Sequence, residues 1–205
     1  MTARKTTIVS VQVLAVIGSL RRRSNTRLVV REVARQLTAR RCVVDVLDFH
    51  AEPLPLYNPD TAYESPAFPA LQKRVQQADV LLLGAPDYHG SISSVMKSFL
   101  DHFWQEFAGK LFATIVSSHE KGLTVTDQLR TVARQCYAWS LPYGVSFTAG
   151  EDVKDGKIVA APLRERLQMF ARDIAVYGAL LAAQRKGDLA GAEPGFMARH
   201  RDSND

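Results

Sequence analysis

Apolar positions follow two alternating patterns along the chain, and this alternation predicts strands and helices in turn. Short apolar runs are typical of β-strands buried on both faces; they cover residues 8–17, 42–47, 79–84, 111–117 and 139–147. Between them, apolar residues recur every three or four positions, as amphipathic helices require. The predicted helices lie around residues 29–37, 68–77, 93–104, 125–136 and 162–183.

Five strands that alternate with helices indicate one α/β domain, a doubly wound five-stranded parallel sheet with helices on both faces. A Pro-rich connection over residues 48–66 is too dense in proline to form a helix. No internal repeat or linker divides the chain. We therefore expect a domain over residues 1–184 and a polar tail over residues 185–205, which we expect to be frayed.

The stretch from Ile8 to Ile17 allows two interpretations. Arg4 and Lys5 precede it, as charged residues precede the hydrophobic region of a signal peptide. However, Ser10 and Gln12 interrupt the run, and no small-x-small cleavage site follows. We interpret the stretch as a buried central strand.

Composition excludes several classes of protein. With 205 residues and two cysteines, the chain offers neither a disulfide framework nor a four-thiolate zinc site, and we expect no metal. No apolar run reaches the roughly 18–20 residues of a membrane span, so we expect a cytoplasmic protein without a membrane partner. The net charge of +5 is concentrated in residues 1–40. Aromatic residues do not interleave with those arginines, so we expect no nucleic-acid partner.

The loop after the first strand, Gly18–Thr26, has the chemistry of a phosphate site. In open α/β sheets, ligands bind at the carboxyl ends of the strands. Hydroxyls of Ser19, Ser24 and Thr26, the charges of Arg21 to Arg23, and the amino end of the next helix all favour an anion. The loop lacks the Walker A ending and the dinucleotide-binding glycines. The alternative is a helix capped by Ser24 or Asn25 beside solvated arginines.

Two further loops reach the same edge of the predicted sheet. In residues 84–92, Pro86 ends the strand, Gly90 permits unusual backbone angles, and Tyr88 and His89 stand where a planar ring could lie. Residues 117–122 add hydroxyls, amides and the His119 imidazole. Each loop alone also fits an ordinary connection between a strand and a helix.

Together these loops resemble the NADPH-dependent FMN reductase family of flavodoxin-like proteins. Gly18, Ser19, Arg21 and Ser24 match that family's Gly-Ser-x-Arg-x-x-Ser-x-Asn signature, although Thr26 replaces its asparagine. The segment 86–92 is similar to the family's Pro-Glu-Tyr-Asn-Gly-Ser-Ile element, with His89 in place of asparagine. Segments 54–57 and 107–110 also look familial, whereas residues 118–120 replace a Gly-rich loop.

The resemblance implies a flavodoxin-like fold and hydride transfer from NADPH to FMN, then electron transfer to a small-molecule acceptor such as a quinone, azo compound, metal oxyanion or free flavin. It also implies a homodimer or homotetramer and no protein nucleophile or general base. The FMN phosphate would lie in the first loop, and the ring would lie against the second loop with the third at its pyrimidine side. The implied FMN-binding residues are Ser19, Arg21, Ser24, Asn25, Thr26, Pro86, Asp87, Tyr88, His89, Gly90, Ser117, Ser118 and His119.

Alternatives remain open at this point. The chain could be a flavodoxin-type electron carrier that does not oxidise NADPH, or a homologue that has lost flavin. His119 could favour the anionic reduced flavin or could be an exposed loop histidine. Arg22 and Arg23 could attract the 2′-phosphate of NADPH or simply be solvated.

Overall fold

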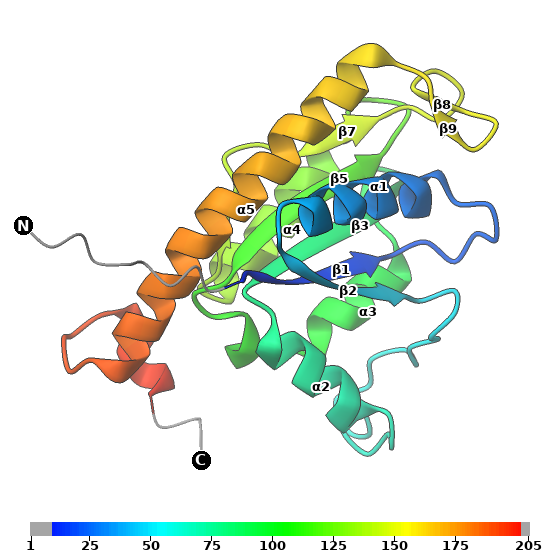
Figure 1. Cartoon of the computed structure of the whole chain (residues 1–205). Helices are drawn as coiled ribbons and strands as arrows, with labels where there is room; N and C mark the ends of the chain where they lie inside the picture. The colour runs from blue at the N-terminus through cyan, green and yellow to red at the C-terminus, as the bar shows by residue number, and fades with distance from the viewer. Residues whose placement is uncertain (1–9, 202–205) are drawn as a thin grey trace, which may run out of the picture.

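A central sheet organises the chain, whose computed structural model describes residues 10–201 (Figure 1). Its parallel strands have the order β2-β1-β3-β5-β6, and β7 also pairs with β5. This order confirms the predicted doubly wound, flavodoxin-like sheet. The strands are β1 (Gln12–Ile17), β2 (Val43–Asp48), β3 (Val80–Tyr88), β5 (Leu111–Ser117), β6 (Trp139–Ser140) and β7 (Val145–Phe147).

The buried strands face two separate hydrophobic cores. In β1, Val13, Ala15 and Ile17 point into one core, and Leu14 and Val16 point into the other. Successive side chains of a strand point to opposite faces, so a strand that is covered on both sides must be apolar throughout. Continuous apolar runs in the sequence arise from this arrangement.

Helices cover both faces of the sheet, as Figure 1 shows. The first core is closed by α1 (Asn25–Ala39) and α5 (Ala161–Ala190). The second core is closed by α2 (Phe68–Gln77), α3 (Ser94–Asp101) and α4 (Leu123–Gln135). Phe99, Phe103 and Phe107, which run from α3 into the following 3₁₀ helix η1 (Gln105–Phe107), belong to this core, whereas Trp104 between them is exposed.

The predicted fifth strand, residues 139–147, is broken in two. Pro142 cannot donate a ladder hydrogen bond, and the chain leaves the sheet between β6 and β7. At Gly144 the backbone passes so close to Thr114 that a Cβ atom would lie 2.5 Å from its hydroxyl. A single apolar segment therefore forms two short strands at one edge.

The prediction of a frayed tail is wrong for residues 185–201. Helix α5 continues to Ala190, and a second 3₁₀ helix, η2 (Phe196–His200), folds back with Met197 buried. Arg185 donates to the Ala108 carbonyl at 2.9 Å, which fixes the end of α5 to the body of the domain. The predicted division at residue 184 stays a prediction.

Smaller differences concern short hairpins and the start of the first strand. The structure adds β4 (Ser91–Ile92), which pairs with the end of β3, and a separate hairpin, β8 (Val153–Lys154) with β9 (Lys157–Ile158). The strand predicted from Ile8 begins at Gln12, and Ile8 and Val9 lie outside the described residues. In residues 10–201, no helix is both long and apolar enough to cross a bilayer.

Lys110 is a fully buried cation at the end of α2. Its ammonium donates to the carbonyls of Val75 and Gln76, two of the groups that a helix leaves unpaired at its carboxyl end. Burial lowers the pKa of Lys110 to about 7, with a smaller contribution from nearby Arg185. This lysine thus joins α2 to the start of β5.

Candidate functional site

The loop after β1 ends in the capped amino end of α1. Ser24 is the N-cap, and its hydroxyl accepts from the Arg27 amide at 3.1 Å. The amides of Asn25 and Thr26 donate no hydrogen bond within the described residues. Because the helix dipole also places partial positive charge there, this end attracts an anion.

The predicted phosphate-binding side chains differ in exposure. The Ser19 and Thr26 side chains are buried beside the free amides, and Asn25 is half-buried. Arg21, by contrast, is exposed and lines a shallow hollow together with its two arginine neighbours. The loop therefore combines buried hydroxyls with the solvated positive charge of a long arginine side chain. This combination suits a dianionic phosphate.

Arg27 holds this loop in place. Its guanidinium donates two hydrogen bonds to the Asp48 carboxylate, at 2.5 and 3.0 Å. It also donates to the carbonyls of Ser19, Arg21 and Arg22, at 3.3, 2.8 and 3.2 Å. A single planar donor group thus fixes three points of the loop and one point at the end of β2.

Asp48 stays ionised in this arrangement. Burial opposes its ionisation, but hydrogen bonds from Arg27 and from the His50 amide outweigh burial and hold the pKa of Asp48 below its ordinary value. Arg31 adds a weaker interaction at 3.6 Å from the same carboxylate. The ion pair therefore persists at neutral pH.

The second loop is a two-residue β-hairpin turn. Asp87 and Tyr88 of β3 pair with Ile92 and Ser91 of β4, which leaves His89 and Gly90 as the turn. Both turn residues have positive φ, 57° and 74°. A type I′ turn requires this conformation, and asparagine or histidine followed by glycine is well suited to it.

Asp87 connects the second loop to the third. One carboxylate oxygen accepts from the Gly90 amide at 2.8 Å, and the other accepts from the Ser118 hydroxyl at 2.8 Å. Gln128 of α4 supports the same turn, because its side-chain amide donates to the Gly90 carbonyl at 3.2 Å. The hydrogen bond between Ser118 and Asp87 therefore joins the second loop directly to the third.

A groove of about 1050 Å³ lies between these two loops. Of the predicted residues, it brings together Asp87, His89, Gly90, Ser118 and His119. Segments of β7 and α4, among them Phe147 and Thr124, form its other walls. His119 is exposed on the wall of the groove.

The first loop opens into a separate hollow that shares no lining residue with the groove. Ser24 and Asn25 line a hollow of about 850 Å³ together with residues of α1 and the β8–β9 turn. Two hydrogen bonds connect this loop to the strands beside it: Gly18 donates to the Gly84 carbonyl at 2.8 Å, and the Ser93 hydroxyl donates to the Gly18 carbonyl at 2.6 Å. Pro86 is buried, Ser117 is half-buried and Tyr88 is exposed, and none of them lines the groove.

Three residues that organise the site are absent from the sequence prediction. Arg27 had a signal, because it lies three residues after a predicted N-cap. However, Arg27, Arg31 and Arg35 recur every four residues, a spacing equally typical of a solvated helix face. Asp48 ends a strand, where a carboxylate is ordinary. No pattern in the sequence could have indicated that Gln128 of α4 contacts the hairpin turn.

Comparisons with known proteins agree with this geometry. A family model described as NADPH-dependent FMN reductase matches residues 11–152. The chain is 27% identical over 185 residues to the NADPH-dependent FMN reductase ArsH of Shigella flexneri, covering 86% of this chain and 72% of that protein. It is 26% identical over 151 residues to an NADPH azoreductase of Bacillus sp. (strain OY1-2), covering 72% of this chain and 82% of that protein.

Solved structures show the same fold at lower identity. The apo form of the NADH:FMN oxidoreductase EMOB superposes with a TM-score of 0.68 at 17% identity, over 82% of this chain and 90% of that one. FerB of Paracoccus denitrificans, a flavoenzyme NAD(P)H:(acceptor) oxidoreductase, gives 0.66 at 20% identity, over 82% and 96%.

Proposed function

Because the chain belongs to the NADPH-dependent FMN reductase family, we propose that its three loops hold FMN and expose the ring to NADPH and a second acceptor. The chain is an FMN-dependent NAD(P)H oxidoreductase. One observation carries the assignment of the loops: the amino end of α1 presents two free amides beside buried hydroxyls, where the family signature lies.

The residues of the first loop fit a phosphate monoester. The free amides of Asn25 and Thr26 and the Ser19 hydroxyl offer fixed donors, and Arg21 supplies charge from the solvent side. The Ser24 hydroxyl can donate its proton to the phosphate while its oxygen accepts from the Arg27 amide. Because Arg27 already orders this loop, binding costs little loop entropy.

The second and third loops fit the edge of a planar ring. The rigid turn at His89 and Gly90 and the adjoining strand residues, Pro86 to Tyr88, would support one side of the ring. Ser117, Ser118 and His119 would face its pyrimidine side. Bound FMN supplies the redox chemistry, two-electron transfer from a nicotinamide to a second acceptor.

The protein's own contribution is positioning. The hydrogen bond that Ser118 donates to Asp87 keeps the two ring-binding loops at a fixed separation, and the bond that the Gly90 amide donates to Asp87 fixes the turn of the second loop. A nicotinamide held roughly 3–3.5 Å from the ring reacts without a protein acid or base. We propose that His119 donates a hydrogen bond to the reduced ring, and that an azo compound is the first acceptor to test, since one relative is named an NADPH azoreductase.

The experiment is an absorption spectrum after FMN addition and desalting, followed by anaerobic NADPH. Retained oxidised-flavin bands that bleach with NADPH support the proposal. Arg21→Gln should release FMN more readily than the control Arg41→Gln, because Arg41 lies at the amino ends of the strands, away from the three loops. Retained bands that do not bleach would indicate an electron carrier. A protein that binds no FMN, even in excess, would refute the proposal.

We also propose that the enzyme is a cytoplasmic homodimer or homotetramer. Exposed apolar side chains on α5, Met169, Val176 and Leu180, recur at helical spacing on one side of the helix. Such a stripe supports contact with a second copy. Sedimentation of Leu180→Lys at the wild-type assembly mass would count against this surface.

A further inference from the structure

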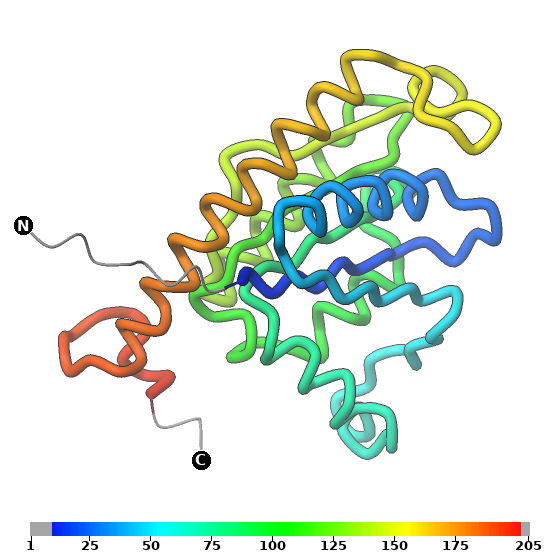
Figure 2. The backbone as a smooth tube through the Cα atoms, viewed as in Figure 1, coloured from blue at the N-terminus to red at the C-terminus, as the bar shows by residue number. Residues whose placement is uncertain are grey.

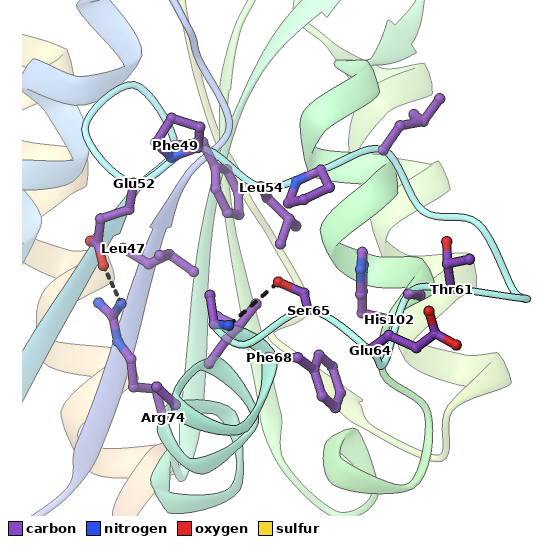
Figure 3. Close-up of a pocket in the computed structure, with 17 residues that line it drawn as sticks. Leu47, Phe49, Glu52, Leu54, Thr61, Glu64, Ser65, Phe68, Arg74 and His102 are labelled. Atoms are coloured by element: carbon purple, nitrogen blue, oxygen red, sulfur yellow. Dashed lines mark hydrogen bonds and ion pairs between the residues drawn. The ribbon is translucent and has the colours of Figure 1, made fainter.

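A second, more enclosed pocket of about 420 Å³ has the Pro-rich connection as one of its walls (Figure 3). It shares no lining residue with the groove between the second and third loops. Its size falls in the range of small-molecule sites, roughly 300–1,000 Å³. Apolar side chains dominate its walls: Leu47, Phe49, Leu54, Ala62, Phe68 and Leu71.

The charged groups of this pocket stand at its margin, where they are paired or solvated. The Arg74 guanidinium donates to Glu52 at 2.7 Å and to the Asp45 carboxylate at 2.7 and 2.9 Å. Figure 3 shows this ion pair at one side of the pocket, whereas Glu64 and Thr61 lie at another. Because Glu64 is exposed, water solvates its charge. The interior therefore favours an uncharged ligand.

Ser65, Thr61 and His102 are uncharged polar residues that line the pocket, and His102 contributes an imidazole. Its Nδ1 atom lies 2.7 Å from the Ser98 carbonyl oxygen. A carbonyl oxygen only accepts, so Nδ1 carries the proton and Nε2 of the neutral ring is an acceptor. His102 is 5% exposed and lines the pocket, yet its Nε2 has no hydrogen-bond partner among residues 10–201.

The walls around His102 are fixed in advance. Phe68 stacks on its ring at 6.1 Å, and Tyr57 meets it edge-on at 5.1 Å. The Ser98 hydroxyl accepts from the Tyr57 amide at 2.8 Å and donates to the Pro55 carbonyl at 3.0 Å, which ties the connection to α3. A ligand thus enters a formed site with aromatic walls.

We infer that this pocket binds a small, uncharged aromatic molecule with one hydroxyl or amine donor, such as a phenol, and that the donor bonds to Nε2 of His102. A cavity of about 150 Å³ suffices for a benzene ring, so 420 Å³ accepts a substituted ring. Aryl ethers and quinones offer only acceptors, and they would leave Nε2 unpaired. A site built to hydrogen-bond a hydroxyl rejects analogues that lack it.

This inference is independent of the proposed flavin chemistry, because the pocket uses none of the loops assigned to FMN. The first test is isothermal titration of the FMN-loaded protein with 4-ethylphenol and with 4-ethylanisole, its methyl ether. We expect the phenol to bind at least tenfold more tightly, a factor that corresponds to about 1.4 kcal/mol. Equal affinities, or no binding of the phenol, would overturn the inference.

Two variants locate the bound phenol. Ala62→Phe fills the pocket and should abolish binding, whereas Ala192→Phe, at an exposed position after the end of α5, is the matched control. If Ala62→Phe does not fold, His102→Leu makes the same test, since it should reduce phenol affinity to that of the ether. A phenol that perturbs the flavin absorption and binds Ala62→Phe or His102→Leu normally lies over the flavin, which would also overturn the inference.

Discussion

Replacing Arg27 with methionine tests how the phosphate-binding loop is held. The substitution keeps an unbranched side chain of similar length but removes five hydrogen bonds: two to Asp48 and three to carbonyls of the loop. It also leaves the Asp48 carboxylate, whose side chain is 7% exposed, without its main partner. We expect Arg27→Met to lower both the stability of the protein and its affinity for FMN.

The magnitude follows from the burial of the pair. Removing one partner of a buried ion pair costs about 3–5 kcal/mol. Arg27 is 14% exposed, and Arg31 lies 3.6 Å from the same carboxylate, where it can partly replace the lost charge. We therefore expect a loss of about 2–3 kcal/mol in the free energy of unfolding. Reordering the freed loop should weaken FMN binding by about tenfold to a hundredfold.

Urea denaturation measures the stability, and quenching of FMN fluorescence measures the affinity. Arg31→Met is the matched control, because its exposed side chain makes no hydrogen bond to the loop. Asp48→Asn added to Arg27→Met should recover part of the stability, since the buried charge is then gone. Wild-type FMN affinity in Arg27→Met, or no recovery in the double variant, would refute the reasoning.

Three other substitutions test neighbouring features. Gly90→Ala should lower the free energy of unfolding by about 1–2 kcal/mol, because alanine is strained at the positive φ of this position although its Cβ would meet no clash. His89→Asn should leave the free energy of unfolding unchanged, and equal losses for the two variants in urea denaturation would contradict this reasoning. Ser118→Ala should weaken FMN binding three- to tenfold, about 1 kcal/mol, through its lost bond to Asp87, and unchanged fluorescence titrations would argue against a role for that bond. Between pH 7 and 9 the unfolded chain binds more protons at Lys110 than the folded one, so wild-type stability should rise with pH, and Lys110→Met should lack that part of the rise.

Most of the fold was predictable, because a strand that is buried on both faces appears in the sequence as a continuous apolar run. The bounds of α2 and β5 are as predicted. The errors arise where contacts between distant segments determine the path of the chain. No short sequence pattern indicates that the chain leaves the sheet at Pro142. Likewise, none indicates that Met197 packs against Gly109 and so holds residues 196–200 against the domain. Tyr177 follows buried Ile174 at helical spacing on α5, yet it is 44% exposed.

The candidate site was predictable as a set of loops but not as a network. Ser24, one of the two predicted N-cap candidates, caps α1, and Gly90, expected to permit unusual backbone angles, has a positive φ in a tight turn. The bonds that fix these loops run between distant segments, such as Arg27 to Asp48 and Ser118 to Asp87. Spacing along the chain carries no information about such pairs.

Both ends of the described chain lie at the amino ends of the strands, as the tube in Figure 2 shows. The chain enters β1 from that end, and α5 returns to it, whereas the three loops follow the carboxyl ends of β1, β3 and β5. A tether attached through Arg201 would therefore extend away from the loops. Immobilisation on an electrode or resin through that end should leave these loops accessible to dissolved nicotinamide and acceptor.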